Sequence, residues 1–190
     1  MTRDKLNDII RDCMKQDRPA QEKLYNHTYG HLLGVALRYT RDREEAEWIF
    51  NLAMLKVFKS LNKYASGTNY LAWARTIIVT TSIDHFRKSK KHKELLSPVD
   101  FSEDERNGQV LNDALDKIAT EDIIRLIQGL DEKERMIFSM YEIDGYKHRE
   151  IEKMTGIKSN TSKWLLAQAK KKLRSKASFL LNNNTYTHEQ

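Results

Sequence analysis

The sequence is poor in the residues that cross-link or interrupt a chain. Its 190 residues include one cysteine, Cys13, two prolines and seven glycines. A single cysteine excludes an internal disulfide and a cysteine-based zinc cluster. Long alternating runs of Val, Ile and Thr are also absent, and apolar residues recur mostly at spacings of three and four. We therefore predict an all-α protein of two small helical domains joined by a linker.

Two further absences narrow the class of protein. No apolar run has the length of a signal segment or a membrane span, so we expect a cytoplasmic protein without membrane insertion. No glycine-rich phosphate loop and no His-Glu-x-x-His motif occur. His27 and His31 share a helix face but lack a third ligand. We predict no catalytic residues, no metal, no cofactor and no enzymatic activity.

Charge is distributed in zones along the chain, which carries a net charge of +6. Residues 1–95 form a first helical domain that ends in a basic run, Arg87 to Lys93. Residues 97–116 hold six carboxylates against one arginine, a net charge of −5. We expect an acidic flexible linker over 96–118, a second helical domain over 119–181 and a disordered tail over 182–190.

The region from Gly145 to Lys176 has the pattern of a helix-turn-helix. Helix formers from Tyr146 to Met154 lead into a short turn at Gly156, and a helical period resumes at Thr161. On the second helix, Leu166, Ala169 and Leu173 are predicted to face inward. Glu152 stands where such motifs usually have a small residue, so the hairpin is either splayed or Glu152 leans outward.

The second helix of this hairpin is strongly basic. From Lys158 to Lys176 it carries seven cations and no acid. A lysine run is often only a solvated face, and hairpins with a glycine turn are common. Because turn, period and one-sided charge coincide here, we predict that this unit binds DNA.

A helix predicted from Asp42 to Leu61 has two apolar faces. The first is a broad core face, and Asp42 with Glu45 forms the capping pattern before it. A second stripe, made of Trp48, Leu52 and Leu55, falls on the opposite side. Either a neighbouring helix of the same domain covers this stripe, or a partner protein docks on it with Trp48 as the anchor. Asp131 with Glu134 is predicted to cap a later helix in the same way.

The helix predicted from Asn69 to about Lys88 places an aromatic ring, two hydroxyls and a cation on one side: Trp73, Thr76, Thr80 and Arg87 recur at spacings of three and four, with Ile83 among them. A loop of small and polar residues precedes it. This combination suits single-stranded DNA. The alternative is that Trp73 and Ile83 pack in the core and that the basic end only complements the helix dipole.

Taken in order, these parts resemble the bacterial sigma factors of the extracytoplasmic-function group, within the sigma-70 family. The resemblance covers about Gln21 to Leu180. In the first domain it is carried by Leu37 to Tyr39, Asp42 to Glu47, Ala72 with Trp73, and Ser82 to Arg87. In the second it is carried by Leu130 to Arg135, Gly145 with Tyr146, Glu150 with Ile151, Thr155 to Ile157, Thr161, and Ala169 to Leu173.

The resemblance implies an initiation subunit that binds core RNA polymerase, through the largest-subunit coiled coil and the flap, and recognises and helps to melt promoter DNA in duplex and single-stranded form. It also implies an anti-sigma protein as a partner. The implied polymerase-binding residues are Glu47, Trp48, Asn51, Leu52 and Leu55. For the minus-ten element they are Lys63, Tyr64, Ser66, Thr68, Asn69, Trp73, Thr76, Thr80, Arg87 and Lys88. For the minus-thirty-five element they are Arg149, Lys158, Ser159, Asn160, Thr161, Lys163, Lys170 and Lys171.

The sequence departs from the family pattern at several of these positions. Trp48 and Leu52 replace acidic residues, Thr80 stands where Asn is common, and Trp164 and Leu165 replace polar residues of the recognition helix, where they pack against either the domain or an inhibitory partner. The main alternative function is a dimeric helix-turn-helix regulator that binds a palindrome without polymerase. A nucleic-acid-processing enzyme is a second alternative, against which the lack of paired carboxylates on one face argues.

Overall fold

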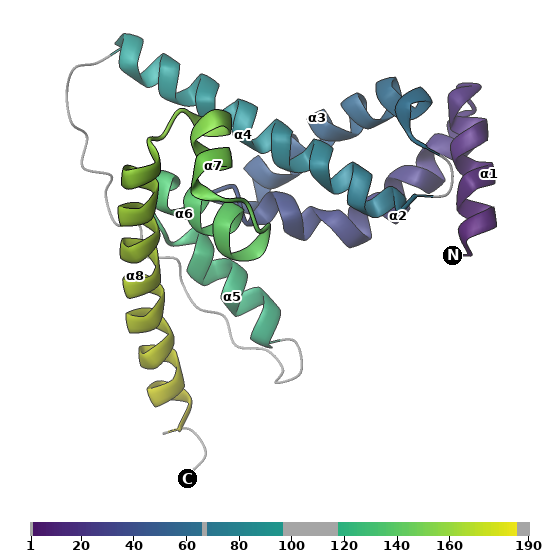
Figure 1. Cartoon of the computed structure of the whole chain (residues 1–190). Coiled ribbons are helices and arrows are strands. Elements are labelled where there is room, and N and C mark those ends of the chain that lie inside the picture. The colour runs from purple at the N-terminus through teal and green to yellow at the C-terminus, as the bar shows by residue number, and fades with distance from the viewer. Residues whose placement is uncertain (1, 66–67, 97–117, 186–190) are drawn as a thin grey trace.

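The computed structural model describes residues 2–65, 68–96 and 118–185, and these residues form helices and no strand (Figure 1). The all-α prediction is confirmed. The first domain consists of α1 (Arg3–Met14), α2 (Arg18–Leu37), α3 (Arg43–Ser60), the short 3-10 turn η1 (Leu61–Lys63) and α4 (Tyr70–Leu96). The second consists of α5 (Ile118–Gln128), α6 (Glu132–Phe138), the π-helical turn η2 (Ser139–Ile143), α7 (His148–Thr155) and α8 (Ser159–Thr185).

The core of the first domain lies where α2, α3 and α4 meet. The core face predicted for the helix from Asp42 to Leu61 is buried, except for Phe58, which is half-buried; its buried residues are Ala46, Ile49, Phe50, Ala53, Met54, Val57 and Leu61. At the centre, the Tyr70 hydroxyl lies 2.9 Å from Thr28 Oγ1, and burial raises the pKa of Tyr70 to about 12. A hydroxyl pair of this kind satisfies two polar groups that water cannot reach.

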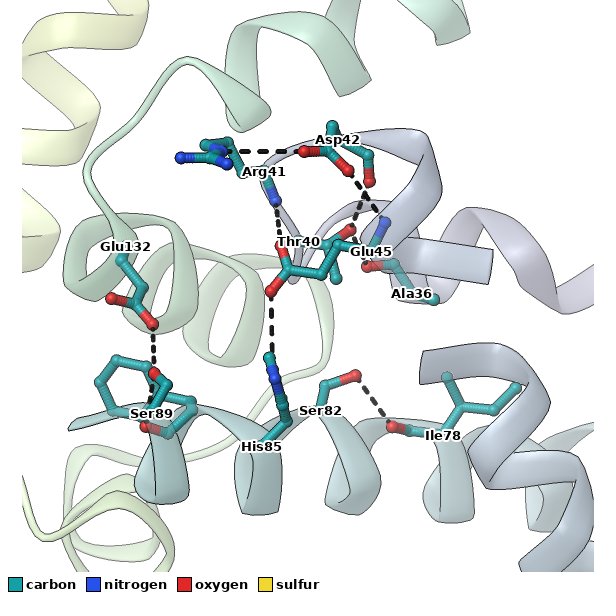
Figure 2. Close-up of polar contacts among 11 residues, drawn as sticks. Ala36, Thr40, Arg41, Asp42, Glu45, Ile78, Ser82, His85, Ser89 and Glu132 are labelled. Carbon is teal, nitrogen blue, oxygen red and sulfur yellow. Dashed lines mark hydrogen bonds and ion pairs between the residues drawn. The ribbon is translucent and has the colours of Figure 1, made fainter. Parts of the chain in front are cut away.

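The two predicted capping patterns have different outcomes. Asp42 accepts a hydrogen bond from the Glu45 amide at 2.9 Å, and the Glu45 carboxylate accepts from the Arg41 amide at 2.9 Å, which fixes the start of α3 (Figure 2). Asp131 lies at the N-cap of α6 as predicted, but its side chain makes no capping hydrogen bond. Its carboxylate instead accepts from Lys172 Nζ at 2.5 Å, a partner far along the chain.

Two helices are longer than predicted. α4 continues past Lys88 to Leu96, and α8 continues past Leu181 to Thr185. The expected disordered tail is therefore wrong for residues 182–185, which extend the helix because no Gly or Pro stops it. The rest of the tail, 186–190, and residues 97–117 of the predicted linker lie outside the described residues.

The two domains pack against each other, with α7 beside α4 and α5 against the end of α2 (Figure 1). Several side chains of the second domain bond to the first, among them Asp144, which is bound by Arg38, Tyr39 and Arg75. Ser139 Oγ donates to the Arg38 carbonyl at 2.8 Å, and Gln128 Nε2 donates to the Leu37 carbonyl at 3.3 Å. Glu132 accepts from Ser89 at 3.0 Å (Figure 2). The contacts of Ser139 and Gln128 satisfy carbonyls at the C-terminal end of α2, which have no partner within the helix.

Candidate functional site

The apolar stripe on α3 is largely uncovered within the described residues. Trp48 is 53% exposed and Leu55 is 57% exposed, while Leu52 between them is half-buried. The nearest aromatic neighbour of Trp48 is the ring of His85 on α4, 5.0 Å away. The structure contradicts the alternative that a neighbouring helix covers the stripe. An exposed indole beside a second large apolar side chain has the character of a protein-docking surface.

The polar residues beside this stripe are tied to α2. Glu47 accepts from the Tyr29 hydroxyl at 3.0 Å and from Arg43 Nε at 2.8 Å. Asn51 accepts from the Tyr25 hydroxyl at 2.7 Å. These hydrogen bonds hold the side chains of Glu47 and Asn51 in place at the edge of the stripe. Both residues stay accessible enough to contact a partner.

A polar contact joins α3 to α4 at His85, the aromatic neighbour of Trp48. Besides capping α3, Glu45 lies 3.5 Å from His85 Nδ1, and Thr40 Oγ1 donates to the Ala36 carbonyl at 3.0 Å (Figure 2). His85 therefore has a carboxylate on one side and the Trp48 ring on another.

The loop before α4 and the start of that helix form an aromatic cluster. The Trp73 ring lies 5.4 Å from Tyr64 and 6.1 Å from Tyr70, and Trp73 is half-buried. Tyr64 is only 6% exposed, and its hydroxyl donates to the Thr68 carbonyl at 2.7 Å. Tyr64 thus positions the loop. Its ring was predicted to contact DNA, but it is buried and cannot do so in this arrangement. Asn69 caps the helix by accepting from the Ala72 amide at 3.2 Å.

Along α4, the predicted minus-ten residues divide into accessible and buried ones. Lys63, Thr68, Thr76, Arg87 and Lys88 are exposed, and Thr80 is half-buried. Ile83 is 3% exposed and belongs to the core. This agrees with the alternative interpretation of this helix, in which Ile83 packs inside the domain. The hydroxyls of Thr76 and Thr80 donate to helix carbonyls four residues earlier. Ser66 lies outside the described residues.

A carboxylate on the first helix of the helix-turn-helix is hydrogen-bonded to the start of the second helix. Gly156 ends α7 with φ +74°, the left-handed conformation that favours glycine. Glu152 accepts hydrogen bonds from both the amide and the hydroxyl of Ser159 at the start of α8. These bonds lower the pKa of Glu152. Glu152 therefore neither splays the hairpin nor leans outward as expected. It joins the two helices.

The outward face of α8 is polar and cationic, with one large aromatic side chain. Leu165 is 6% exposed and packs inside the domain, whereas Trp164 is 60% exposed. The exposed residues near the start of the helix are Lys158, Asn160, Thr161, Lys163, Trp164 and, further along, Lys171; Arg149 on α7 is exposed as well. Ser159, by contrast, is half-buried and engaged by Glu152 and by the His148 carbonyl at 3.3 Å.

The lysine run of α8 is divided by ion pairs. Lys170 Nζ lies 2.7 Å from Glu142. Lys172 Nζ lies 2.5 Å from Asp131 and 2.9 Å from Glu134. The hydrogen bond to Asp131 raises the pKa of Lys172. Lys170 and Lys172 thus hold α8 against η2 and α6, while Lys171 points away from both.

The sequence did not single out two residues that matter here. His148 Nδ1 lies 2.8 Å from Ser162 Oγ, and its ring stacks on Tyr141 at 4.4 Å, so it bridges α7, α8 and η2. Burial lowers the pKa of His148. Asp144 lies between the domains and is bound by residues of α2 and α4. Neither belongs to a motif, and only their tertiary contacts reveal them.

Within the described ranges, no cluster of three or more His, Cys, Asp or Glu side chains could hold a metal ion. No helix there is long and apolar enough to cross a membrane. The arrangement offers two contact surfaces instead: an apolar one on α3 and a cationic one on α8.

Two family models match the chain. The model described as Sigma-70 region 2 matches residues 24–92, and the one described as Sigma-70, region 4 matches residues 120–173. Among characterised proteins, the ECF RNA polymerase sigma factor SigK of Mycobacterium ulcerans (strain Agy99) is 22% identical over 175 residues, which is 90% of this chain and 92% of that protein.

Two solved structures are similar as well. One is the sigma factor RpoE in complex with the anti-sigma factor NepR from Bartonella quintana, with a TM-score of 0.49 and 18% identity over 81% of this chain and 94% of that one. The other is CnrH in complex with the cytosolic domain of CnrY, with a TM-score of 0.43 and 13% identity; the match covers 90% of this chain and 95% of that one.

Proposed function

Because the chain belongs to the sigma-70 family, in its extracytoplasmic-function group, and is a sigma factor that binds core RNA polymerase and promoter DNA and directs transcription initiation, we propose how its parts divide that work. Residues 1–95 bind polymerase and the minus-ten element, residues 96–118 connect the domains, and residues 119–181 bind the minus-thirty-five element. The observation that carries this division is that an apolar and a cationic surface lie on different domains.

The polymerase contact is assigned to α3. Trp48 and Leu55 supply exposed apolar surface, and Glu47 and Asn51 supply oriented polar groups at its edge. Large aromatic side chains that become buried at the centre of an interface contribute most of its binding energy. We therefore expect Trp48 to anchor the chain on the largest-subunit coiled coil.

The minus-ten contact is assigned to the loop before α4 and to the exposed side of that helix. Thr68 and Asn69 offer polar groups near the half-buried ring of Trp73, and Arg87 and Lys88 offer exposed cations. Bases taken from a duplex are held by stacking and short polar groups, while cations follow the phosphates. Tyr64 supports this loop from inside.

The minus-thirty-five contact is assigned to the outward face of α8. Asn160, Thr161 and Lys163 lie near the helix start, where a recognition helix reaches base edges. Trp164 lies on the exposed side with them, and its apolar ring suits the 5-methyl groups of thymine in the major groove. We assign Lys171 to a phosphate contact. Lys170 forms an ion pair with Glu142, which must break before Lys170 can bind a phosphate.

Sigma factors are generally non-enzymatic, and we propose that this chain has no catalytic activity of its own. Its place of action is the cytoplasm, at the nucleoid, because polymerase and promoters are found there. We propose an anti-sigma protein as a further partner on the grounds of the family resemblance.

The test of the proposed function is run-off transcription with purified core polymerase, with and without the chain, on its own upstream region. Promoter-specific transcripts that require the chain support the proposal. Tight binding of the free chain to a symmetric operator, with no transcripts, would instead support a dimeric regulator.

A further inference from the structure

Two arginines and a tyrosine of the first domain converge on one carboxylate of the second. Arg38 Nη2 donates to Asp144 Oδ1 at 3.1 Å. Arg75 donates to the same oxygen, and the Tyr39 hydroxyl donates to Oδ2. Arg38 and Tyr39 lie at the end of α2, Arg75 lies on α4, and Asp144 lies just after η2. Three donors of the first domain, two directly after α2 and one on α4, thus surround a single anion that the other domain supplies.

The carboxylate is almost completely removed from water. The Asp144 side chain is 4% exposed, against 17% for Arg38 and 41% for Arg75. Burial, with the negative charge of Asp144 second, raises the pKa of Tyr39 and keeps its hydroxyl a donor. A buried carboxylate needs such partners, since an unpaired one would be strongly unfavourable. Arg38 Nε is itself buried without a hydrogen-bond partner, so the first domain has one further donor at this place.

The pairing lies beside the surface assigned to promoter DNA. A cleft between the domains is lined by Arg75, Thr76, Val79, Asp144 and Tyr146. Thr76 belongs to the face of α4 that the proposed function gives to the minus-ten element. The second domain therefore covers one side of that face and places its own carboxylate on Arg75.

We propose that Arg38, Tyr39 and Arg75 form a phosphate-binding site of the first domain, which Asp144 occupies while the domains are packed together and which a backbone phosphate of the captured DNA strand occupies once they separate. This inference rests on the proposed function, because it concerns the same DNA-binding face. Guanidinium groups bind carboxylate and phosphate through the same hydrogen-bond geometry, so one anion can replace the other.

The remaining polar contacts between the domains do not prevent separation. The carbonyls of Leu37 and Arg38, now bonded to Gln128 and Ser139, can be satisfied by water when the domains part, and so can the hydroxyl of Ser89, now bonded to Glu132. Interfaces between domains of one chain commonly open, and the apparent affinity of a ligand for a covered site falls with the fraction of open molecules. Asp144 thereby lowers the affinity of the free chain for single-stranded DNA.

The experiment uses the full-length chain and a fluorescein-labelled oligothymidylate of about 20 nucleotides, since a phosphate site does not depend on base sequence. Asp144→Asn keeps the size of the side chain and removes its charge. We expect a larger radius of gyration by small-angle X-ray scattering and roughly tenfold tighter oligonucleotide binding by anisotropy. Asp122→Asn, a half-buried aspartate paired with Arg125 on α5, is the control for net charge and should change neither.

The phosphate assignment is tested in the open background. Adding Arg75→Gln to Asp144→Asn should reverse the gain and reduce the slope of log affinity against log salt by about 0.7, the value for one phosphate on a single strand. Adding Arg11→Gln, which removes an exposed arginine of α1, should do neither. If the Arg75 variant keeps both affinity and slope, the site does not bind phosphate and the proposal is overturned.

Arg75→Gln alone is the second variant should Asp144→Asn lose its circular dichroism signal. It weakens the same contact from the other domain, so scattering should show expansion without a gain in oligonucleotide binding. If scattering by every folded variant matches that of the unmodified chain, the proposal is overturned. Run-off transcription by the unmodified chain is independent of this result, so failure of the proposed function is distinguished from failure of the phosphate site.

Discussion

The two proposed contact surfaces of this sigma factor differ in polarity: one is apolar and the other is cationic. On α3 the exposed groups are an indole and an aliphatic side chain, Trp48 and Leu55. On α8 they are lysines and short polar side chains around Trp164. Contacts made by apolar burial depend little on salt, whereas contacts with DNA phosphates weaken steeply as salt rises. If these assignments hold, we expect the chain to stay on polymerase at salt concentrations that release its DNA contacts.

The largest effect is expected at the apolar surface. Trp48→Ala should weaken binding to core polymerase by about 2 kcal/mol or more, roughly 30-fold, with the same slope against salt as the unmodified chain. Surface plasmon resonance at several salt concentrations measures both. Met14→Ala, which shortens an apolar side chain 46% exposed elsewhere in this domain, is the matched control. A changed salt slope for Trp48→Ala would contradict the apolar character of the contact.

The next effect concerns stability and compares a glycine of the second domain with one of the first. Gly156→Ala should destabilise the hairpin of α7 and α8 by about 1 to 2 kcal/mol, because an L side chain resists a φ of +74°. Gly30→Ala is the control, since a Cβ meets nothing within 4 Å at either position and Gly30 lies inside α2 with ordinary φ. Thermal unfolding should show a lower transition for Gly156→Ala only. Equal transitions would show that the left-handed turn does not limit stability.

A smaller effect distinguishes neighbouring lysines on the cationic surface. Lys171→Ala should reduce the salt slope of duplex promoter binding in the holoenzyme by about 0.9, the value for one phosphate on B-DNA. Lys170→Ala should reduce it less, because Lys170 already has Glu142 as a partner at 2.7 Å. Filter binding across a salt series gives both slopes. Equal slopes for the two variants would mean that the ion pair opens on DNA.

The smallest effect concerns pH. The hydrogen bonds from Ser159 lower the pKa of Glu152 below its ordinary value of 4.5. Its contribution to stability is therefore complete above the unfolded pKa and is lost as pH falls through the folded one. Melting temperatures of the unmodified chain and of Glu152→Gln should differ at neutral pH and converge once the pH falls below the folded pKa of Glu152. A difference that persists in acid would contradict the role of the ionised carboxylate.

Much of the architecture was predictable because a helical period is a local property. Three local features lie as expected: the core face of α3, the inward-facing side of α8 at Leu166 and Ala169, and the turn at Gly156. The predicted helix ends were less reliable, since α4 and α8 extend further than their predicted ends. The roles of single residues within a face were less predictable still. Tyr64 and Ser159 lie in predicted binding segments but form hydrogen bonds inside the protein.

The order of amino acids alone determined that the chain is helical, where its charge zones fall and which family it resembles, because periodicity and motif depend on neighbours a few residues apart. The tertiary structure decided which side chains on each face are available. It pairs Lys170 and Lys172 with carboxylates, leaves Trp48 and Trp164 uncovered and brings Asp144 to Arg38 across 106 positions. Contacts of that range arise from packing, and no local pattern specifies them.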